Sequence, residues 1–346
     1  MESPILPLYR LKIYKLRTFI LILIFSTITA AFSFPERDQE LTVQVVDYVI
    51  KNQYNSALGA IQTFQAQDGD PLPSLLKLAV FGMRDVDFEQ IIDSTEFLSC
   101  YDSASAILVA WEQTNGVTSY TRTLSGLCKA IYSAYYIRQK KYIAAMRNGF
   151  DALDHLREAQ QMDSTNYEVD FFLGLYEYAR AELRSRLWWV LFWYPGSREK
   201  GIERVKRCST RALLTGEAAK LSLCDMYIQE KRNEEAKQVL GELKKRYPES
   251  RFVLWAEVKY FEAENNFSAA AATYAKLAML YKKEKFGEFN AFSTSFMQAN
   301  MLYKSGDTNS SKELCNNILQ KRNINAYRDL KKETGKLLER CNAVKN

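Results

Sequence analysis

The sequence predicts an all-α fold, a solenoid of stacked antiparallel helix pairs, and three observations support it. Only 14 Gly and 7 Pro occur in 346 residues, whereas turn-dense all-β folds need many of both. Apolar residues recur at helical spacing, and no stretch alternates with period 2 for long enough to indicate a strand. Two segments in the carboxyl-terminal half repeat 34 residues apart. A repeat of this length is typical of a helix-turn-helix unit that stacks on its neighbours.

Residues 1–33 predict a secretory signal peptide rather than a part of the stack. An uncharged run over 18–35, apolar throughout 19–25, follows four basic residues, Arg10, Lys12, Lys15 and Arg17. Small residues at positions 31 and 33 match an A-x-A-like cleavage site. The alternative is an uncleaved anchor, because about 18 uncharged residues reach the lower limit for crossing a bilayer. Export predicts a periplasmic or cell-envelope protein in a bacterium and a secreted protein otherwise.

Residues 34–346 are expected to form a single helical-repeat domain, since no Pro-, Gly- or Ser-rich linker interrupts them. In the first unit, an apolar stripe around 46–49 is followed by a polar turn at 51–53 and by Ala57, and Asp70-Pro71 is read as its end. The stretch 100–120 is the least regular, with a turn at Asn115-Gly116. Further along, a polar turn at 139–141 precedes small residues and another apolar stripe.

The clearest repeat pairs 227–236 with 261–270. Ala236 and Ala270 occupy the same place in the two copies, where a second helix packs so closely that only a small side chain fits. Pro248 closes the first copy, because proline cannot continue a helix. Near the end, Gly306 is expected at a helix C-terminus, followed by a partner helix over 308–319. At two helices per unit the chain holds roughly 14 to 18 helices, an arrangement typical of tetratricopeptide repeats.

An aromatic and basic insert at 180–211 departs from the plain repeat. It contains nine basic and three acidic residues, so it carries +6, whereas the chain from residue 34 onward sums to +3. One interpretation buries the aromatic residues in a helix that ends near Tyr194 and lets Ser197 cap a helix starting at Arg198. The other leaves them at the surface beside cations, in contact with a partner or with lipid headgroups. The candidate contact residues are Trp188, Trp189, Trp193, Arg198 and Arg204.

Three motifs resemble one family. They are Leu-Gly-Leu-Tyr-Glu-Tyr at 173–178, the Trp-rich run after it, and Gly-Ser-Arg-Glu-Lys-Gly-Ile at 196–202. They look like tetratricopeptide proteins related to the inclusion-body clearance type, which include exported bacterial members. The resemblance covers roughly 120–275 and implies a helical-repeat adaptor without an established catalytic site.

Six cysteines permit two interpretations. As neighbouring pairs they are 28, 16 and 26 residues apart, so each pair would staple a helix hairpin in an oxidising compartment. The pairs are Cys100 with Cys128, Cys208 with Cys224, and Cys315 with Cys341. The alternative is six small, buried apolar side chains. No C-x-x-C motif occurs, which argues against a zinc ribbon or a thioredoxin-like site.

The composition favours binding over catalysis. His155 is the only histidine, so histidine triads and multi-histidine metal sites are excluded. Phosphate-loop, dinucleotide-binding, zincin and hydrolase-elbow motifs are absent from the sequence, and we expect no cofactor. The modest charge argues against nucleic acid as a partner.

We therefore expect a non-catalytic protein-protein interaction scaffold whose protein or peptide partner the sequence does not identify. A membrane-surface scaffold acting through 187–211 is the alternative, and an enzyme using carboxylate or tyrosine chemistry is the third hypothesis. Tyrosines on helix faces supply either contact area for a partner or ordinary core packing, and they include Tyr132, Tyr135, Tyr136 and Tyr142.

Overall fold

The computed structural model describes residues 36–64, 69–186, 196–212 and 215–344, and all regular structure in these ranges is helical. The prediction of an all-α fold is confirmed. Fifteen α-helices and one 3-10 turn are described. In order they are α2 (Glu36–Ile50), α3 (Tyr54–Thr63), α4 (Leu72–Asp87), α5 (Ser94–Asn115), α6 (Ser119–Arg138), α7 (Tyr142–Met162), α8 (Tyr167–Arg186), α10 (Arg198–Arg211), α11 (Gly216–Gln229), α12 (Asn233–Arg246), α13 (Arg251–Ala263), α14 (Phe267–Lys282), α15 (Glu288–Lys304), α16 (Thr308–Leu319), η1 (Arg322–Ala326) and α17 (Arg328–Ala343).

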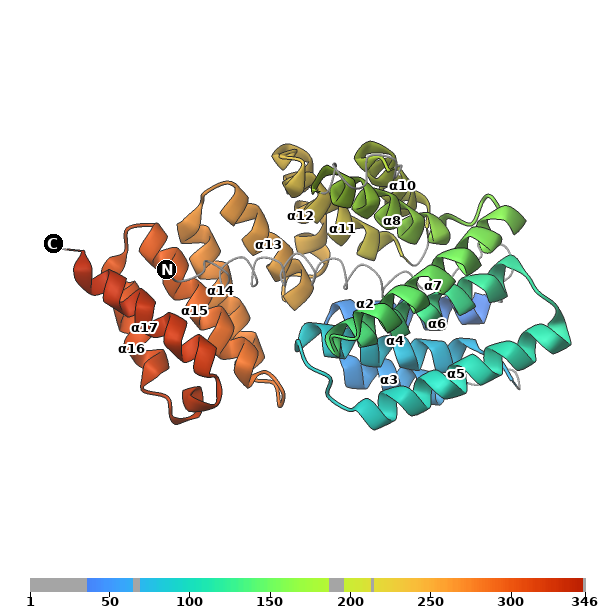
Figure 1. Ribbon diagram of the computed structural model, residues 1–346, viewed down its shortest axis with the longest axis horizontal. Coiled ribbons are helices and arrows are strands. Elements are labelled where there is room, and N and C mark those ends of the chain that lie inside the picture. The colour runs from blue at the N-terminus through green and yellow to red at the C-terminus, as the bar shows by residue number, and fades with distance from the viewer. Residues whose placement is uncertain (1–35, 65–68, 187–195, 213–214, 345–346) are drawn as a thin grey trace. The chain divides into compact units, whose positions relative to one another are not determined.

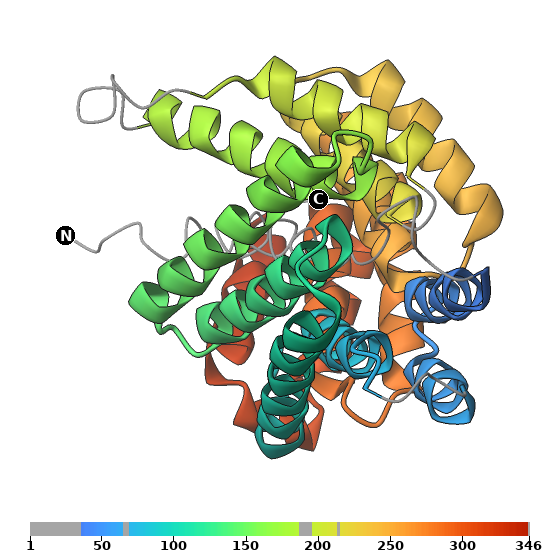
Figure 2. The same cartoon turned by 90° about the vertical axis from the view of Figure 1, so that its right-hand side faces the viewer.

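Consecutive helices pack as neighbours, as a solenoid of helix pairs requires. In the first part of the chain α6 lies against α7 and α8 lies against α10, and both pairs run side by side in two views (Figures 1 and 2). In the last part α13 to α17 pack in series, each helix against the next (Figure 1). Stacked antiparallel pairs are therefore confirmed.

The chain divides into two compact units, Met1–Met226 and Tyr227–Asn346, with the boundary inside α11. We expected one continuous domain over 34–346. A stack of repeats has no single central core, so compact units can separate within it without a linker sequence to mark the boundary.

One turn geometry joins two helices at five places. A residue with positive φ ends the first helix, and the amide after it donates to the carbonyl five residues back, as in a Schellman motif. At Asn265, for example, the Asn266 amide donates to the Phe261 carbonyl at 2.8 Å. The positive-φ residues of the five turns are Asn52, Lys140, Lys231, Asn265 and Gly306.

A small buried residue follows each of these turns, five positions after the positive-φ residue. Its amide donates to the carbonyl of the N-cap residue, which immediately precedes the second helix, and its side chain is at most 3% exposed. The predicted close-packing positions Ala236 and Ala270 are both among them, and the full set is Ala57, Ala145, Ala236, Ala270 and Ser311. The repeat seen in the sequence is thus a repeat of backbone geometry.

Two local expectations are corrected. Residues 100–115 of the stretch 100–120, expected to be the least regular, belong to the 22-residue helix α5. The turn expected at Asn115-Gly116 is confirmed, because α5 ends at Asn115 and Gly116 has a φ of 81°. Asp70-Pro71 does not end a helix, because α3 has already ended at Thr63. Asp70 instead lies two residues before the start of α4 and accepts a hydrogen bond at 2.9 Å from the amide of Leu72, the first residue of that helix.

The predicted signal segment 1–33 lies outside the described residues. In the part of the chain that is described, no helix is both long enough and apolar enough to cross a bilayer.

Candidate functional site

The predicted contact residues of the insert have different positions. Trp188, Trp189 and Trp193 lie outside the described residues. Ser197 caps α10 as predicted, accepting a hydrogen bond from the Lys200 amide at 3.2 Å, and Arg198 is the first residue of that helix. Its side chain is half-buried.

Arg204 takes part in an internal ion pair. Asp170, buried on α8, accepts hydrogen bonds from Arg204 Nη1 at 3.0 Å and from Arg207 Nε at 2.7 Å. A desolvated carboxylate must be paired, because an isolated charge in the interior costs several kcal/mol. Arg204 and Arg207 thus join α10 to α8, and part of the positive charge that the sequence concentrates in the insert is paired with a buried carboxylate.

All six cysteines are buried, and none of them forms a disulfide. Burial raises the pKa of Cys100 and of Cys315 to about 11 and that of Cys128 to about 12. Two of the three sequence-predicted pairs are neighbours in space. Cys100 raises the pKa of Cys128 by its charge, and Cys315 and Cys341 both interact with the Ser311 hydroxyl, Cys341 at 3.3 Å. Because the pKa values of Cys100, Cys128 and Cys315 are raised, the thiolate of these residues, which is the reactive form, is scarce at neutral pH.

A tyrosine cluster lies between α5 and α6. The rings of Tyr101 and Tyr132 stack with centroids 3.7 Å apart, and the Tyr132 and Tyr136 hydroxyls are hydrogen-bonded at 2.8 Å. Burial, followed by the hydrogen bond to Tyr136, raises the pKa of Tyr132. Tyr135 is buried and stacks on Phe97 at 4.4 Å.

The structure thus distinguishes among the four tyrosines singled out in the sequence. Tyr135 is core, Tyr132 and Tyr136 are half-buried, and Tyr142 is 53% exposed.

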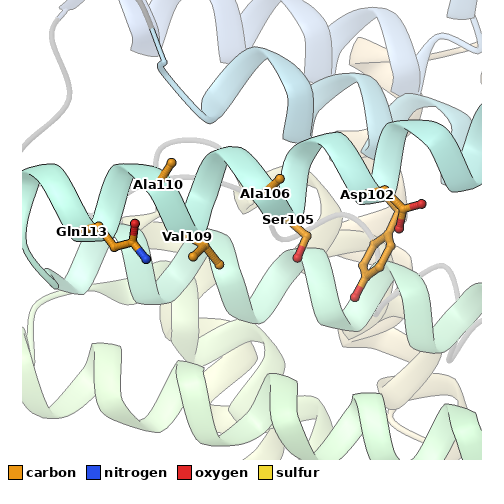
Figure 3. Close-up of a pocket in the computed structure, with 7 residues that line it drawn as sticks. Asp102, Ser105, Ala106, Val109, Ala110 and Gln113 are labelled. Carbon is orange, nitrogen blue, oxygen red and sulfur yellow. The ribbon is translucent and has the colours of Figure 1, made fainter.

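A shallow groove open to solvent runs along α5 beside this cluster. It has a volume of about 490 Å³ and extends from Asp102 at one end to Gln113 at the other (Figure 3). Its wall is made of small or short side chains, and Val109 is 54% exposed. The lining residues are Tyr101, Asp102, Ser105, Ala106, Val109, Ala110 and Gln113.

Sequence reasoning missed this groove. The available signal was the weak contrast between apolar and polar faces over 100–115. Such a segment is helical yet not amphipathic when the face turned away from the core also carries small and apolar residues.

A charged cluster joins three helices near one end of the groove. Arg122 on α6 contacts Glu112 of α5 through Nη1 at 3.2 Å and Glu158 of α7 through Nε at 2.8 Å. Its Nη1 also lies 3.5 Å from His155 Nδ1. Because arginine only donates, this contact is a hydrogen bond in the neutral tautomer that carries its ring proton on Nε2.

Burial, and after it the Arg122 charge, lowers the pKa of His155. The histidine is therefore neutral at pH 7, and both carboxylates of the cluster are engaged by one guanidinium. This arrangement fastens α5, α6 and α7 together. Among the described residues, no group of three or more His, Cys, Asp or Glu side chains is placed to hold a metal ion.

Comparison with known proteins adds no relative. No protein-family model matches the chain, and no curated protein matches it. The likeness to tetratricopeptide proteins of the inclusion-body clearance type stays a prediction from the motifs.

Proposed function

We propose that this chain is a non-catalytic scaffold of the cell envelope that binds a helical segment of a partner protein along α5. The groove on α5 beside the tyrosine cluster is the observation that carries the proposal. The envelope location rests on the export signal expected from residues 1–33.

The side chains of the groove suit a helix. Ser105 with Val109, and Ala106 with Ala110, form two rows at i, i+4 spacing. Rows of short side chains let a second helix approach closely and place its own ridge between them. The groove from Asp102 to Gln113 is roughly 17 Å long at 1.5 Å per residue, which matches about three turns of a partner helix.

The neighbouring α6 surface provides anchoring contacts. Tyr132 and Tyr136 are half-buried, so their rings are already held in place before a partner arrives. Held rings lose little conformational entropy on binding. Lys129, whose Nζ donates to the Tyr101 hydroxyl at 3.3 Å, adds a positive charge at the same edge. Such a surface offers an apolar strip with a polar border, as protein interfaces do.

The groove can be tested by filling it. A photo-crosslinking residue at Val109 in the full chain should capture a partner in the native envelope. Adding Ala106→Trp and Ala110→Trp should reduce capture at least about tenfold, because two indoles occupy the space of the partner helix.

Ala106→Ser with Ala110→Ser is the matched control, since serine changes the same two positions of the groove wall but leaves the groove open. Circular dichroism should be unchanged in both variants. Equal capture by the filled and control variants would contradict the proposal.

The alternative function is a membrane-surface scaffold acting through 187–211. Its tryptophans lie outside the described residues, and Arg204 is engaged by Asp170. Membrane fractionation of the intact protein and of a Trp188→Ser, Trp189→Ser, Trp193→Ser variant tests it, and unchanged soluble behaviour in both rejects it.

A further inference from the structure

The first half of α7 exposes an apolar stripe that none of the described helices covers. Ile143 is 82% exposed, Met146 60% and Phe150 48%. At i, i+3 and i+7 these residues lie on one face of the helix, opposite the buried Ala145 and Ala152. Tyr142, 53% exposed, lies beside them. Scattered exposed apolar residues are ordinary, but four within nine residues form a patch that calls for an explanation.

Positive charge surrounds this stripe. No Asp or Glu occurs from 113 to 150, and the part of this interval at the stripe holds four basic residues, Arg138, Lys140, Lys141 and Arg147. Lys140, Lys141 and Arg147 are exposed, and Lys141 Nζ lies 5.9 Å from the centroid of the Tyr136 ring. Acidic residues begin only at Asp151, so the patch is confined to the first turns of α7. We call residues 138–150 the α7 patch.

We propose that the α7 patch docks on the surface of an anionic membrane, with its apolar side chains inserted among the lipid headgroups. Exposed fractions of 82% and 60% mean that Ile143 and Met146 protrude from the surface. The headgroup zone accepts protruding apolar side chains, and the absence of Asp and Glu from 113 to 150 favours a uniformly anionic surface over a partner of mixed charge. Basic residues beside an inserted apolar stripe complement anionic lipid, and tyrosine favours this zone.

This inference is independent of the α5 groove. It also concerns a segment other than 187–211, so it does not depend on the tryptophans of the insert.

A local probe tests the proposal in the full chain. The predicted apolar run at 19–25 could bring the protein to vesicles by itself, so cosedimentation alone does not decide. An environment-sensitive fluorophore on Ile143→Cys reports contact at the patch, and the native cysteines are buried. We expect its emission to shift to the blue with vesicles of phosphatidylcholine and phosphatidylglycerol in equal parts. Met279→Cys, at an exposed position on α14 (62% exposed), is the matched control and should not respond.

The charge requirement is tested separately. Each basic residue at an anionic surface contributes about 1 kcal/mol, or about fivefold in binding. Changing Lys140, Lys141 and Arg147 to Gln should therefore raise the lipid concentration at half-maximal response about 100-fold. These side chains are exposed, so circular dichroism should be unchanged.

Three outcomes would overturn the proposal. The label at position 143 could stay in water while the protein cosediments with vesicles. It could respond equally to pure phosphatidylcholine. It could instead respond to a soluble acidic amphipathic peptide and to no vesicle, in which case the patch binds protein.

Discussion

The crossing of α8 and α10 depends on two glycines, and Gly201→Ala is the sharpest test of the packing. A Cβ at Gly201 would lie 2.7 Å from the Gly174 carbonyl oxygen and 2.8 Å from both the amide nitrogen and the Cβ of Tyr178. Two of these three atoms belong to the backbone, which cannot rotate away. The helices would have to separate by about 0.7 Å to restore ordinary van der Waals contact at 3.4 Å.

The cost of this separation outweighs the gain from alanine. Alanine in a helix interior is about 1 kcal/mol better than glycine, whereas overpacking costs about 1–3 kcal/mol and sometimes more. The ion pairs from Arg204 and Arg207 to Asp170 bridge the same two helices, so separation also weakens a buried carboxylate's pairing. We expect a net destabilisation of about 1–2 kcal/mol.

Urea unfolding followed by circular dichroism measures the change, and amide hydrogen exchange in α8 and α10 localises it. Gly59→Ala in α3 is the control, because Gly59 is exposed in the same unit and a Cβ there meets nothing within 4 Å. That variant should gain about 0.5–1 kcal/mol. If Gly201→Ala stabilises the protein as Gly59→Ala does, the close approach of α8 and α10 is wrong.

Three further predictions concern titration and thiols. Burial raises the pKa of Asp85 from 3.8 to about 6, so between pH 4 and pH 6 the folded state holds a proton that the unfolded state releases. Stability should fall by up to about 3 kcal/mol as pH rises through this window. The urea midpoint of the wild-type protein should therefore decrease with pH, and a midpoint of Asp85→Asn that does not change with pH would support the raised pKa of Asp85. His155 should give stability the opposite pH dependence. Because its pKa is lowered in the folded state, the unfolded state binds a proton first as pH falls below about 6.5. Stability is then lost on acidification, and His155→Gln should reduce that loss, whereas an unchanged pH profile would count against a neutral, buried ring. Finally, an alkylating reagent at pH 8 should leave the folded protein unmodified and add six groups after denaturation without reductant, as measured by mass spectrometry. Each disulfide present would remove two of the six.

The sequence predicted the parts of the fold that local chemistry determines. Ala236 and Ala270 could be recognised because the second helix of a pair leaves room for only a small side chain at that place. The ends of α12 and α15, and the start of α10 after Ser197, follow from capping residues and proline. In the candidate site, tyrosine-rich α6 was recognised as a surface that either packs or binds.

Properties that depend on distant partners could not be predicted. Arg204 is one of nine basic residues in its segment, and only the fold shows that Asp170, 34 residues away, takes it as an ion-pair partner. Likewise, the pKa of His155 is lowered first by burial and then by the charge of Arg122, which another helix supplies. The charge pattern of a segment predicts the sign of its net charge, but it does not show which of its charged residues form ion pairs with buried groups.

The two surfaces proposed here have a common physical origin. Helical periodicity tells which residues share a face, but a face becomes core only where a neighbouring helix covers it. On α6 the same spacing leaves Tyr135 buried and Tyr132 half-buried, because helices cover one position more fully than the other. The groove face of α5 and the outer face of α7 carry apolar side chains that the fold leaves exposed. Because exposing apolar surface forgoes stabilisation of about 25 cal/mol per Å², these two faces are the ones where we propose contacts outside the chain, and such faces can be located only once the packing of the helix pairs is known.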